Sequence, residues 1–325
     1  MKKIFIPGGA GYVGTVLAEI LLKLNYKVTV YDLFIYGDHI NDHPNLKKIK
    51  GDIRDLKKIS NSVKDHNIVI HLACISNDPS YDLNPKLSKS INYDCFENFV
   101  KASKENEIER FIYASSSSVY GIKKEKNVYE DMKLEPLTDY SVYKVMCENI
   151  LNKYSSENFI TINARPSTVC GFSKRQRFDL VVNILTNQAY HTKKIKVFGG
   201  DQLRPNIHIN DMCQAYVDLI KADSSLVNRQ AFNIGFENFP VLEIANIVKK
   251  NMDHEVLLEK VGTDDIRSYH VSSEKIKSTI NFKTKYDIDS AVRDLKNAFK
   301  NNFFKNPLTN EEYFNIKKMQ KINLE

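Results

Sequence analysis

Tyr140 and Lys144 have the residue types and the spacing that could move a proton. They lie four residues apart near the start of a predicted helix, so both side chains share one face. A nearby ammonium favours phenolate over phenol and lowers the pKa of a tyrosine from its usual value of about 10. A lowered pKa lets a tyrosine accept a hydroxyl proton near neutral pH. Taken alone, such a pair could equally be part of a solvated helix face.

A run of four serines, residues 115–118, follows a predicted strand over residues 110–114. Hydroxyl groups at the carboxyl end of a parallel strand lie where α/β sheets bind their ligands. A serine run by itself is more often a plain loop. Its occurrence ahead of the Tyr140–Lys144 pair, in this order, argues against chance for both features.

Gly8, Gly11 and Gly14 form the pattern G-x-x-G-x-x-G, directly after a predicted strand and at the start of a predicted helix. Glycines at these places permit a tight turn, a close approach of backbone to a pyrophosphate, and close packing of helix on strand. The helix N-terminus adds free N–H groups and a partial positive charge. Three spaced glycines could be a simple turn, but this context predicts a dinucleotide site.

Asp32 ends the next predicted strand, where a carboxylate accepts a hydrogen bond from the 2′-hydroxyl of a dinucleotide ribose. The same carboxylate would repel a 2′-phosphate, and no arginine follows closely to offset that repulsion. Asp32 alone could be a helix or turn cap. Together with the glycine loop, it predicts NAD rather than NADP as the cofactor.

The elements that would position these groups alternate between strand and helix. Strands are predicted at residues 3–6, 27–31, 46–49, 68–72, 110–114 and 159–163, and helices near 13–24, 59–64, 85–107 and 139–156. This alternation predicts an α/β fold with a doubly wound parallel sheet, of the Rossmann type.

From about residue 171 the alternation loosens, with helices predicted near 180–189, 211–220 and 242–250. We expect residues 1–170 to form the NAD-binding Rossmann domain, with 205–235 returning to it. Residues 171–204 and 236–325 would form a smaller, interleaved α/β substrate-binding lobe. The segment from Pro307 onward could be an ordered tail or an exposed end.

The bulk composition suits such a protein. The 325 residues suffice for two lobes, and the net charge of +7 comes from scattered lysines, so we expect no nucleic-acid partner. The five cysteines form no close pair, so neither a metal site nor a disulfide framework is indicated. No stretch resembles a signal peptide or reaches the roughly 20 apolar residues of a membrane span. We expect a cytoplasmic protein without a membrane partner.

Taken together, these residues resemble the extended short-chain dehydrogenase/reductase superfamily, specifically its NAD-dependent sugar-nucleotide epimerases and dehydratases. Further motifs agree in order: GDI at 51–53, HLAC at 71–74, IN at 91–92, RPSTVCG at 165–171, RPNIHINDM at 204–212, FNIG at 232–235 and RSYHVSSEKIK at 267–277. The agreement runs from about residue 3 to about residue 300.

The resemblance implies a role for individual residues. The catalytic residues would be Ser116, Tyr140 as the base, and Lys144. The cofactor would contact Gly8, Gly11, Tyr12, Val13, Gly14, Asp32, Leu33, Asp52, Ile53, Leu72, Ala73, Asn92, Ser115, Tyr140, Lys144 and Pro166. A nucleotide-diphosphate sugar would contact Ser76, Ser116, Thr168, Arg204 and Arg267, the two arginines binding its diphosphate.

Departures from the family pattern narrow the reaction. Dehydratases of the family carry an Asp-Glu pair directly after the catalytic Thr, but this chain has Ser117 and Ser118, which argues against loss of water. Thr168 stands where many galactose-type epimerases have Asn, so this position does not identify the sugar of the substrate. Residues 77–85 and 175–177 resemble a branch of heptose- and hexose-nucleotide oxidoreductases of bacterial surface polysaccharides.

Three functions follow from the resemblance. The first is NAD-dependent epimerisation of a nucleotide-linked sugar through a transient 4-keto intermediate. The second is a dehydrogenase that oxidises carbon 4 of a nucleotide-linked hexose or heptose and releases the keto sugar. The third is a non-catalytic NAD- or RNA-binding protein, although such members commonly lose the Tyr–Lys pair. The family typically forms homodimers, and the apolar face of residues 92–100 would suit either a dimer contact or core packing.

Overall fold

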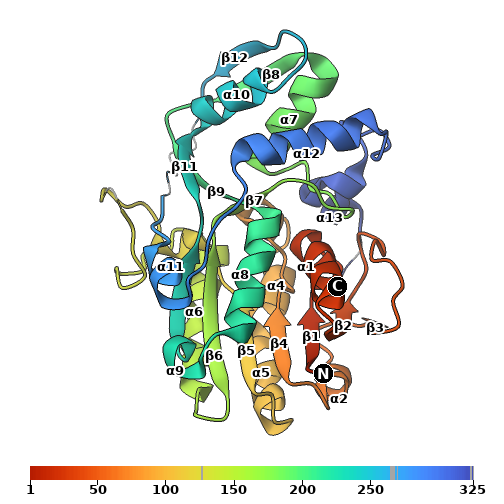
Figure 1. The fold of residues 1–325 in the computed structure, drawn as a ribbon, viewed down its shortest axis with the longest axis vertical. Coiled ribbons are helices and arrows are strands. Elements are labelled where there is room, and N and C mark those ends of the chain that lie inside the picture. The colour runs from red at the N-terminus through yellow and green to blue at the C-terminus, as the bar shows by residue number, and fades with distance from the viewer. Residues whose placement is uncertain (126, 264–267, 269, 323, 325) are drawn as a thin grey trace.

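The computed structural model describes residues 1–125, 127–263, 268, 270–322 and 324. Its main sheet has seven parallel strands in the order β10-β6-β5-β4-β1-β2-β3 (Figure 1). The strands are β1 (Lys3–Pro7), β2 (Lys27–Asp32), β3 (Leu46–Lys50), β4 (Ile68–His71), β5 (Arg110–Ala114), β6 (Ile160–Pro166) and β10 (Gln230–Ile234). The strand order reverses between β1 and β4, and sheets of this kind bind ligands beyond the carboxyl ends of the strands at such a reversal.

Helices cover both faces of this sheet, because its central strands are apolar on both sides. One face carries α1 (Tyr12–Lys23) and α8 (Ile209–Lys221), which pack on each other and on the sheet. The other face carries α2 (Leu56–Val63), α5 (Phe96–Glu105) and α6 (Asp139–Tyr154). The predicted doubly wound α/β fold is therefore confirmed.

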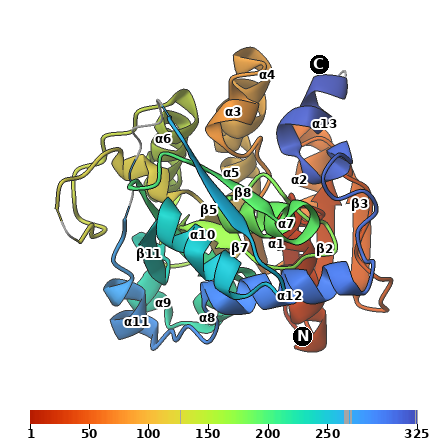
Figure 2. The same ribbon diagram turned by 90° about the horizontal axis from the view of Figure 1, so that it is seen from above.

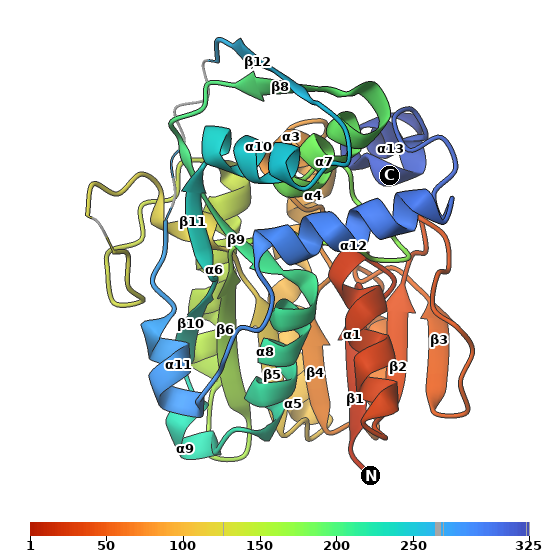
Figure 3. The same cartoon turned by 45° about the horizontal axis from the view of Figure 1, so that its top comes forward.

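A second group of elements lies beyond the carboxyl ends of the main strands (Figures 1 and 3). It contains a three-stranded sheet of β7 (Thr168–Cys170), β9 (Leu203–His208) and β11 (Glu237–Pro240), and a pair of β8 (Lys194–Phe198) and β12 (Leu257–Val261). Its long helices are α7 (Val181–Thr192), α10 (Val241–Lys250) and α12 (Ile288–Lys300), which share one apolar core.

Short helices complete the fold. They are α3 (Asp78–Tyr81), α4 (Pro85–Lys89), a π-helical turn (Ser90–Asp94), a 3₁₀ turn (Ser117–Tyr120), α9 (Ser224–Val227), α11 (Glu274–Ile280), a second 3₁₀ turn (Glu311–Tyr313) and α13 (Asn315–Lys321). In the part of the chain that the structure describes, no helix has the length and apolar character to cross a membrane. The five cysteines are free thiols.

The single helix predicted at residues 85–107 is divided into α4, the π-helical turn and α5. The wider turn carries Asn92, whose side chain accepts from the Ile75 N–H at 2.8 Å and donates to the Ile75 carbonyl at 3.0 Å. Such turns often occur near functional sites. The apolar face of residues 92–100 packs into the core, where Phe96, Phe99 and Val100 are buried.

The segment after Pro307 is ordered and returns to the body of the protein. The Pro307 carbonyl accepts from the Asn187 side chain at 2.8 Å, and the Tyr313 carbonyl accepts from the Phe178 N–H at 2.8 Å. Helix α13 then lies beside α3 (Figure 2). The C-terminal segment is thereby brought to the carboxyl edge of the main sheet.

Candidate active site

A cavity of about 760 Å³ lies at the carboxyl edge of the main sheet. Its volume falls within the range of roughly 300–1,000 Å³ that is typical of ligand sites. Nineteen of the residues predicted from the sequence line it: Gly8, Gly11, Tyr12, Val13, Gly14, Asp32, Leu33, Asp52, Ile53, Leu72, Ala73, Ser76, Ser115, Ser116, Tyr140, Lys144, Pro166, Thr168 and Arg204. Asn92 is not among the lining residues, and Arg267 lies outside the described residues.

The glycine loop is shaped in a way that only glycine allows. Gly8 has a φ of +79°, and a Cβ there would lie 2.4 Å from the backbone nitrogen of Ala73. A Cβ on Gly14 would lie 2.6 Å from the Cα of Gly9. Gly11 is the N-cap of α1, so the free N–H groups of the first helical turn border the cavity. These features fit the pyrophosphate of a dinucleotide.

Asp32, at the end of β2, is held in place by two backbone donors. One carboxylate oxygen accepts from the Phe34 N–H at 2.8 Å and the other from the Ala10 N–H at 3.0 Å. Burial raises the pKa of this carboxyl above its ordinary value. Each oxygen keeps a further lone pair, so the fixed carboxylate fits the ribose hydroxyls of the same cofactor.

Helix α6 brings Tyr140 and Lys144 to the cavity. The helix begins at a capping box in which the side chains of Thr138 and Ser141 each accept from the other's backbone N–H. Lys144 donates from Nζ to the Ala114 carbonyl at 2.6 Å, and its Nζ lies 5.6 Å from the centre of the Tyr140 ring. The end of β5 thus fixes the lysine beside the tyrosine.

The expected lowering of the Tyr140 pKa is wrong for this structure. Burial raises the pKa well above its ordinary value, and Cys74 and Asp78 raise it further. The guanidinium of Arg177 and a hydrogen bond with Ser116 act in the opposite direction. The spacing of the tyrosine and the lysine did not reveal how completely the phenol is removed from water, which disfavours its charged form.

The serine run follows β5 and turns into the cavity. The Ser116 Oγ accepts from the Ser118 N–H at 3.1 Å and lies 2.9 Å from the Ser118 Oγ. Ser117 and Ser118 also line the cavity, so two hydroxyls stand where dehydratases would carry carboxylates. The Ser115 hydroxyl donates a hydrogen bond to the Glu148 carboxylate, so this side chain is not directed at the cofactor alone.

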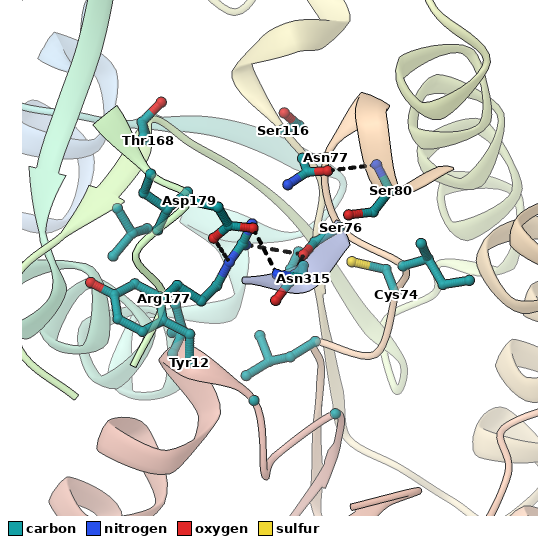
Figure 4. Close-up of a pocket in the computed structure, with 18 of the residues that line it drawn as sticks. Tyr12, Cys74, Ser76, Asn77, Ser80, Ser116, Thr168, Arg177, Asp179 and Asn315 are labelled. Carbon is teal, nitrogen blue, oxygen red and sulfur yellow. Dashed lines mark hydrogen bonds and ion pairs between the residues drawn. The ribbon is translucent and has the colours of Figure 1, made fainter. Parts of the chain in front are cut away.

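A polar network of Ser76, Arg177, Asp179 and Asn315 spans the cavity (Figure 4). Arg177 binds Asp179 through two bonds of 2.9 and 3.2 Å and donates to the Ser76 Oγ at 3.1 Å. Asn315 donates from its side chain to Ser76 and from its backbone to Asp179, both at 3.1 Å. Of this network, the sequence predicted only Ser76, as a substrate residue, while the pattern at 175–177 indicated a family branch rather than a site; Asp179 and Asn315 were not predicted.

The remaining predicted substrate residues lie in the second group of elements. Thr168 begins β7, and Arg204 lies in β9, where its Nη1 donates to the Leu203 carbonyl at 3.0 Å. Among the described residues, no group of three or more His, Cys, Asp or Glu side chains is placed to hold a metal ion.

Comparison with known proteins agrees with this geometry. The model of the family described as "NAD dependent epimerase/dehydratase family" matches residues 4–235. A UDP-glucose 4-epimerase from Lactobacillus helveticus is 25% identical over 313 residues, covering 89% of this chain and 94% of the relative. A putative UDP-glucose 4-epimerase from Methanocaldococcus jannaschii is 25% identical over 307 residues, covering 92% and 99%.

Solved structures share the fold. An epimerase from Methanothermobacter thermautotrophicus superposes with a TM-score of 0.84 at 21% identity, covering 93% of each chain. The UDP-glucuronic acid 4-epimerase of Bacillus cereus, solved with UDP-glucuronic acid and NAD, has a TM-score of 0.81 at 23% identity and covers 92% of this chain and 99% of its own. At these identities the likeness concerns the fold.

Proposed function

Because the chain belongs to the NAD-dependent epimerase/dehydratase family, we propose that it epimerises a nucleotide-linked sugar through a transient 4-keto intermediate. The observation that carries this proposal is the meeting of Ser116, Tyr140 and Lys144 in the cavity that the glycine loop and Asp32 also line. Membership of the family supports the general kind of enzyme, and these three side chains support the proposed reaction.

Tyr140 takes the proton from the hydroxyl on carbon 4 of the sugar. The Ser116 hydroxyl donates a hydrogen bond to the same oxygen and steadies it as it becomes a ketone. Lys144, fixed by the Ala114 carbonyl, places its positive charge beside the phenolate. NAD, when bound, supplies the hydride acceptor and donor and the positive charge of its nicotinamide ring. When the ketone is reduced from its other face, Tyr140 returns the proton.

We place the cofactor in residues 1–170 with 205–235, and the sugar nucleotide in the lobe of residues 171–204 and 236–325. Thr168, Ser76 and Arg204 would contact the sugar nucleotide from the cavity wall, and Arg267 would join them.

We also propose a homodimer in the cytoplasm. Ser117 and Ser118 support epimerisation over dehydration, because neither hydroxyl is an effective acid or base for the loss of water.

The test is an analysis of products after incubation with UDP-, GDP-, CDP- and dTDP-sugars and NAD. An unchanged mass with a new stereoisomer by NMR is the expected result and would identify the substrate. A mass lower by two hydrogens would establish a dehydrogenase instead. Loss of water would show that the inference from Ser117 and Ser118 is wrong, and no product from any sugar would favour a non-catalytic role.

The Asp32→Asn variant is expected to bind NAD about 10- to 100-fold more weakly, because a hydrogen bond to a charged group contributes about 1.5–3 kcal/mol. The same change removes the charge that would repel a 2′-phosphate, so the preference for NAD over NADP should narrow. Titration calorimetry with both cofactors measures this. Asp42→Asn, at a fully exposed carboxylate, is the matched control, and an unchanged NAD affinity in Asp32→Asn would remove Asp32 from the cofactor site.

The pH profile is expected to follow the raised pKa of Tyr140. Below that pKa, the phenolate fraction grows about tenfold per pH unit, so kcat/KM should rise with pH from about 6 to 9. Steady-state rates across this range give the profile. A flat profile would contradict a raised pKa of Tyr140 in the working enzyme, and a profile that falls with rising pH would contradict the assignment of Tyr140 as the base.

A further inference from the structure

Two arginines two residues apart line the cavity, and among the described residues only one of them has a carboxylate partner that forms hydrogen bonds to it. Arg175 and Arg177 are both buried, at 3% and 8% exposure, in the segment between β7 and α7. Arg177 forms a two-point ion pair with Asp179. Buried guanidinium groups are normally matched in this way, so the surroundings of Arg175 require an explanation.

The partners of Arg175 within the described chain are neutral. Its Nη2 donates to the Asn315 Oδ1 at 2.7 Å, and its Nη1 donates to the Gln176 carbonyl at 3.4 Å. The guanidinium carbon lies 3.8 Å from the centre of the Tyr36 ring. Its Nε is buried and has no hydrogen-bond partner among the described residues. Burial, with repulsion by Arg177, lowers the pKa of Arg175 to about 10, so it stays charged at neutral pH.

A buried cation with an unused donor is costly unless an anion joins it. Arg175 lines the same cavity as the glycine loop, and the charged or titratable groups that act on it at longer range are Arg177, Tyr36, Asp179 and Asp32. Asp32 and Tyr36 come from the end of β2 and the loop after it. These residues border the adenosine half of a dinucleotide site. The planar fork of arginine matches the oxygens of a phosphate. Arg204 lies in β9, whereas Arg175 lies between β7 and α7 and reaches the side of the cavity near Asp32 from the same proposed lobe.

Asn315, the first residue of α13, connects Arg175 to the rest of the cavity wall. It accepts from Arg175, donates from its side chain to Ser76 and donates from its backbone to Asp179. Figure 4 shows Asn315 beside Arg177 and Ser76 above the glycine loop. Met319 and Leu324 from the same C-terminal segment also line the cavity. The end of the chain therefore contributes directly to the cleft.

We propose that Arg175 binds a phosphate of the dinucleotide cofactor, and that Asn315 positions Arg175 for this contact. The proposal rests on the assignment of this cleft to the cofactor, not on the epimerase reaction. Its test can therefore use binding alone, and its outcome is separate from the outcome of the product analysis.

The first experiment compares Arg175→Met with Lys174→Met, the same change at the neighbouring cation that pairs with Glu19. Calorimetry measures the binding of NAD, ADP-ribose, adenosine and UDP to each full-length protein. We expect Arg175→Met to weaken NAD and ADP-ribose about tenfold or more, with adenosine unchanged and Lys174→Met like the wild type. Arg175→Lys, which keeps the charge, should lose less.

Several outcomes would overturn the proposal. Unchanged NAD affinity in Arg175→Met would mean that no cofactor phosphate contacts this side chain. A loss confined to UDP would assign Arg175 to the substrate diphosphate. An equal loss for adenosine would assign the effect to packing on Tyr36. If Arg175→Met does not fold, Arg175→Lys is compared with Arg175→Gln, which lacks the positive charge. Equal NAD affinity in these two variants would contradict a phosphate contact.

The role of Asn315 is tested by Asn315→Asp. Aspartate keeps the acceptor for Arg175 and gives the guanidinium a carboxylate partner. Because a carboxylate cannot donate, the Ser76 hydroxyl must donate to it in place of accepting from the Asn315 amide. If Arg175 serves a phosphate, this variant should bind NAD about tenfold more weakly while its thermal unfolding temperature stays near that of the wild type. A merely structural contact would be satisfied by aspartate, so an unchanged NAD affinity would remove Asn315 from the site.

Discussion

The Tyr140→Phe variant is expected to lose about 10²–10⁴-fold in kcat, the usual contribution of a positioned acid–base group. The change removes only the phenolic oxygen, and the ring stays in the cavity beside Lys144. NAD binding should therefore stay within a few-fold of the wild type. Turnover of the nucleotide sugar and NAD titration, measured on the same preparation, separate these two effects.

Tyr143→Phe is the matched control for this experiment. Tyr143 lies one helical turn from Tyr140 on α6, and its ring stacks on Tyr93 with the centres 5.0 Å apart. Removal of its hydroxyl should leave kcat within a few-fold of the wild type. Near-normal turnover in Tyr140→Phe would refute the proposed base, whatever the product of the reaction.

The Arg165→Met variant should lose about 3–5 kcal/mol of unfolding free energy, the usual cost of removing one partner of a buried ion pair. Arg165 binds both oxygens of Glu148, at 2.9 and 2.6 Å, and the two side chains are 5% and 4% exposed. The variant leaves the carboxylate of Glu148 buried without its cation. Urea denaturation, followed by circular dichroism, gives the free energy.

Lys2→Met is the control, because Lys2 pairs with Glu109 at the surface and both side chains are about half exposed. Exposed pairs of this kind contribute roughly 0–1 kcal/mol. Since Glu148 also accepts from Ser115, Arg165→Met should disturb the serine run as well. A loss below about 1 kcal/mol in Arg165→Met would show that the pair contributes little to stability, as some buried pairs do.

The parts of the site that could be predicted from the sequence are those that local motifs encode. The glycine loop and the serine run each follow a strand, and Asp32 ends one, so recognising the strand is enough to bring them to one edge of the sheet. The Tyr140–Lys144 pair is likewise set by one helix. All of these residues line the cavity in the structure.

The features that escaped prediction depend on contacts between distant segments. Arg175 and Asn315 are separated by 140 positions and are linked by a side-chain hydrogen bond. Asn92 lies in a motif of the family, but its two hydrogen bonds to Ile75 come from a π-helical turn that periodicity does not reveal. The upward shift of the Tyr140 pKa depends on burial by residues of the whole cleft, which cannot be predicted from the spacing of Tyr140 and Lys144.

The contacts of Asn315 make the C-terminal segment part of the site. The sequence alone did not decide whether the segment from Pro307 onward is ordered. Through Asn315 it joins Ser76, which follows β4, to Asp179, which precedes α7. The two groups of elements are thereby linked across the cavity by a buried network.

Oxidation and reduction of carbon 4 within one catalytic cycle can be tested with an isotope label. The nucleotide sugar that turns over is prepared with deuterium on carbon 4, and the epimer is analysed by NMR after reaction in ordinary water. The epimer is expected to carry deuterium at carbon 4, with none lost to solvent. Loss of the label to solvent, or its appearance outside the sugar with keto sugar accumulating, would contradict it.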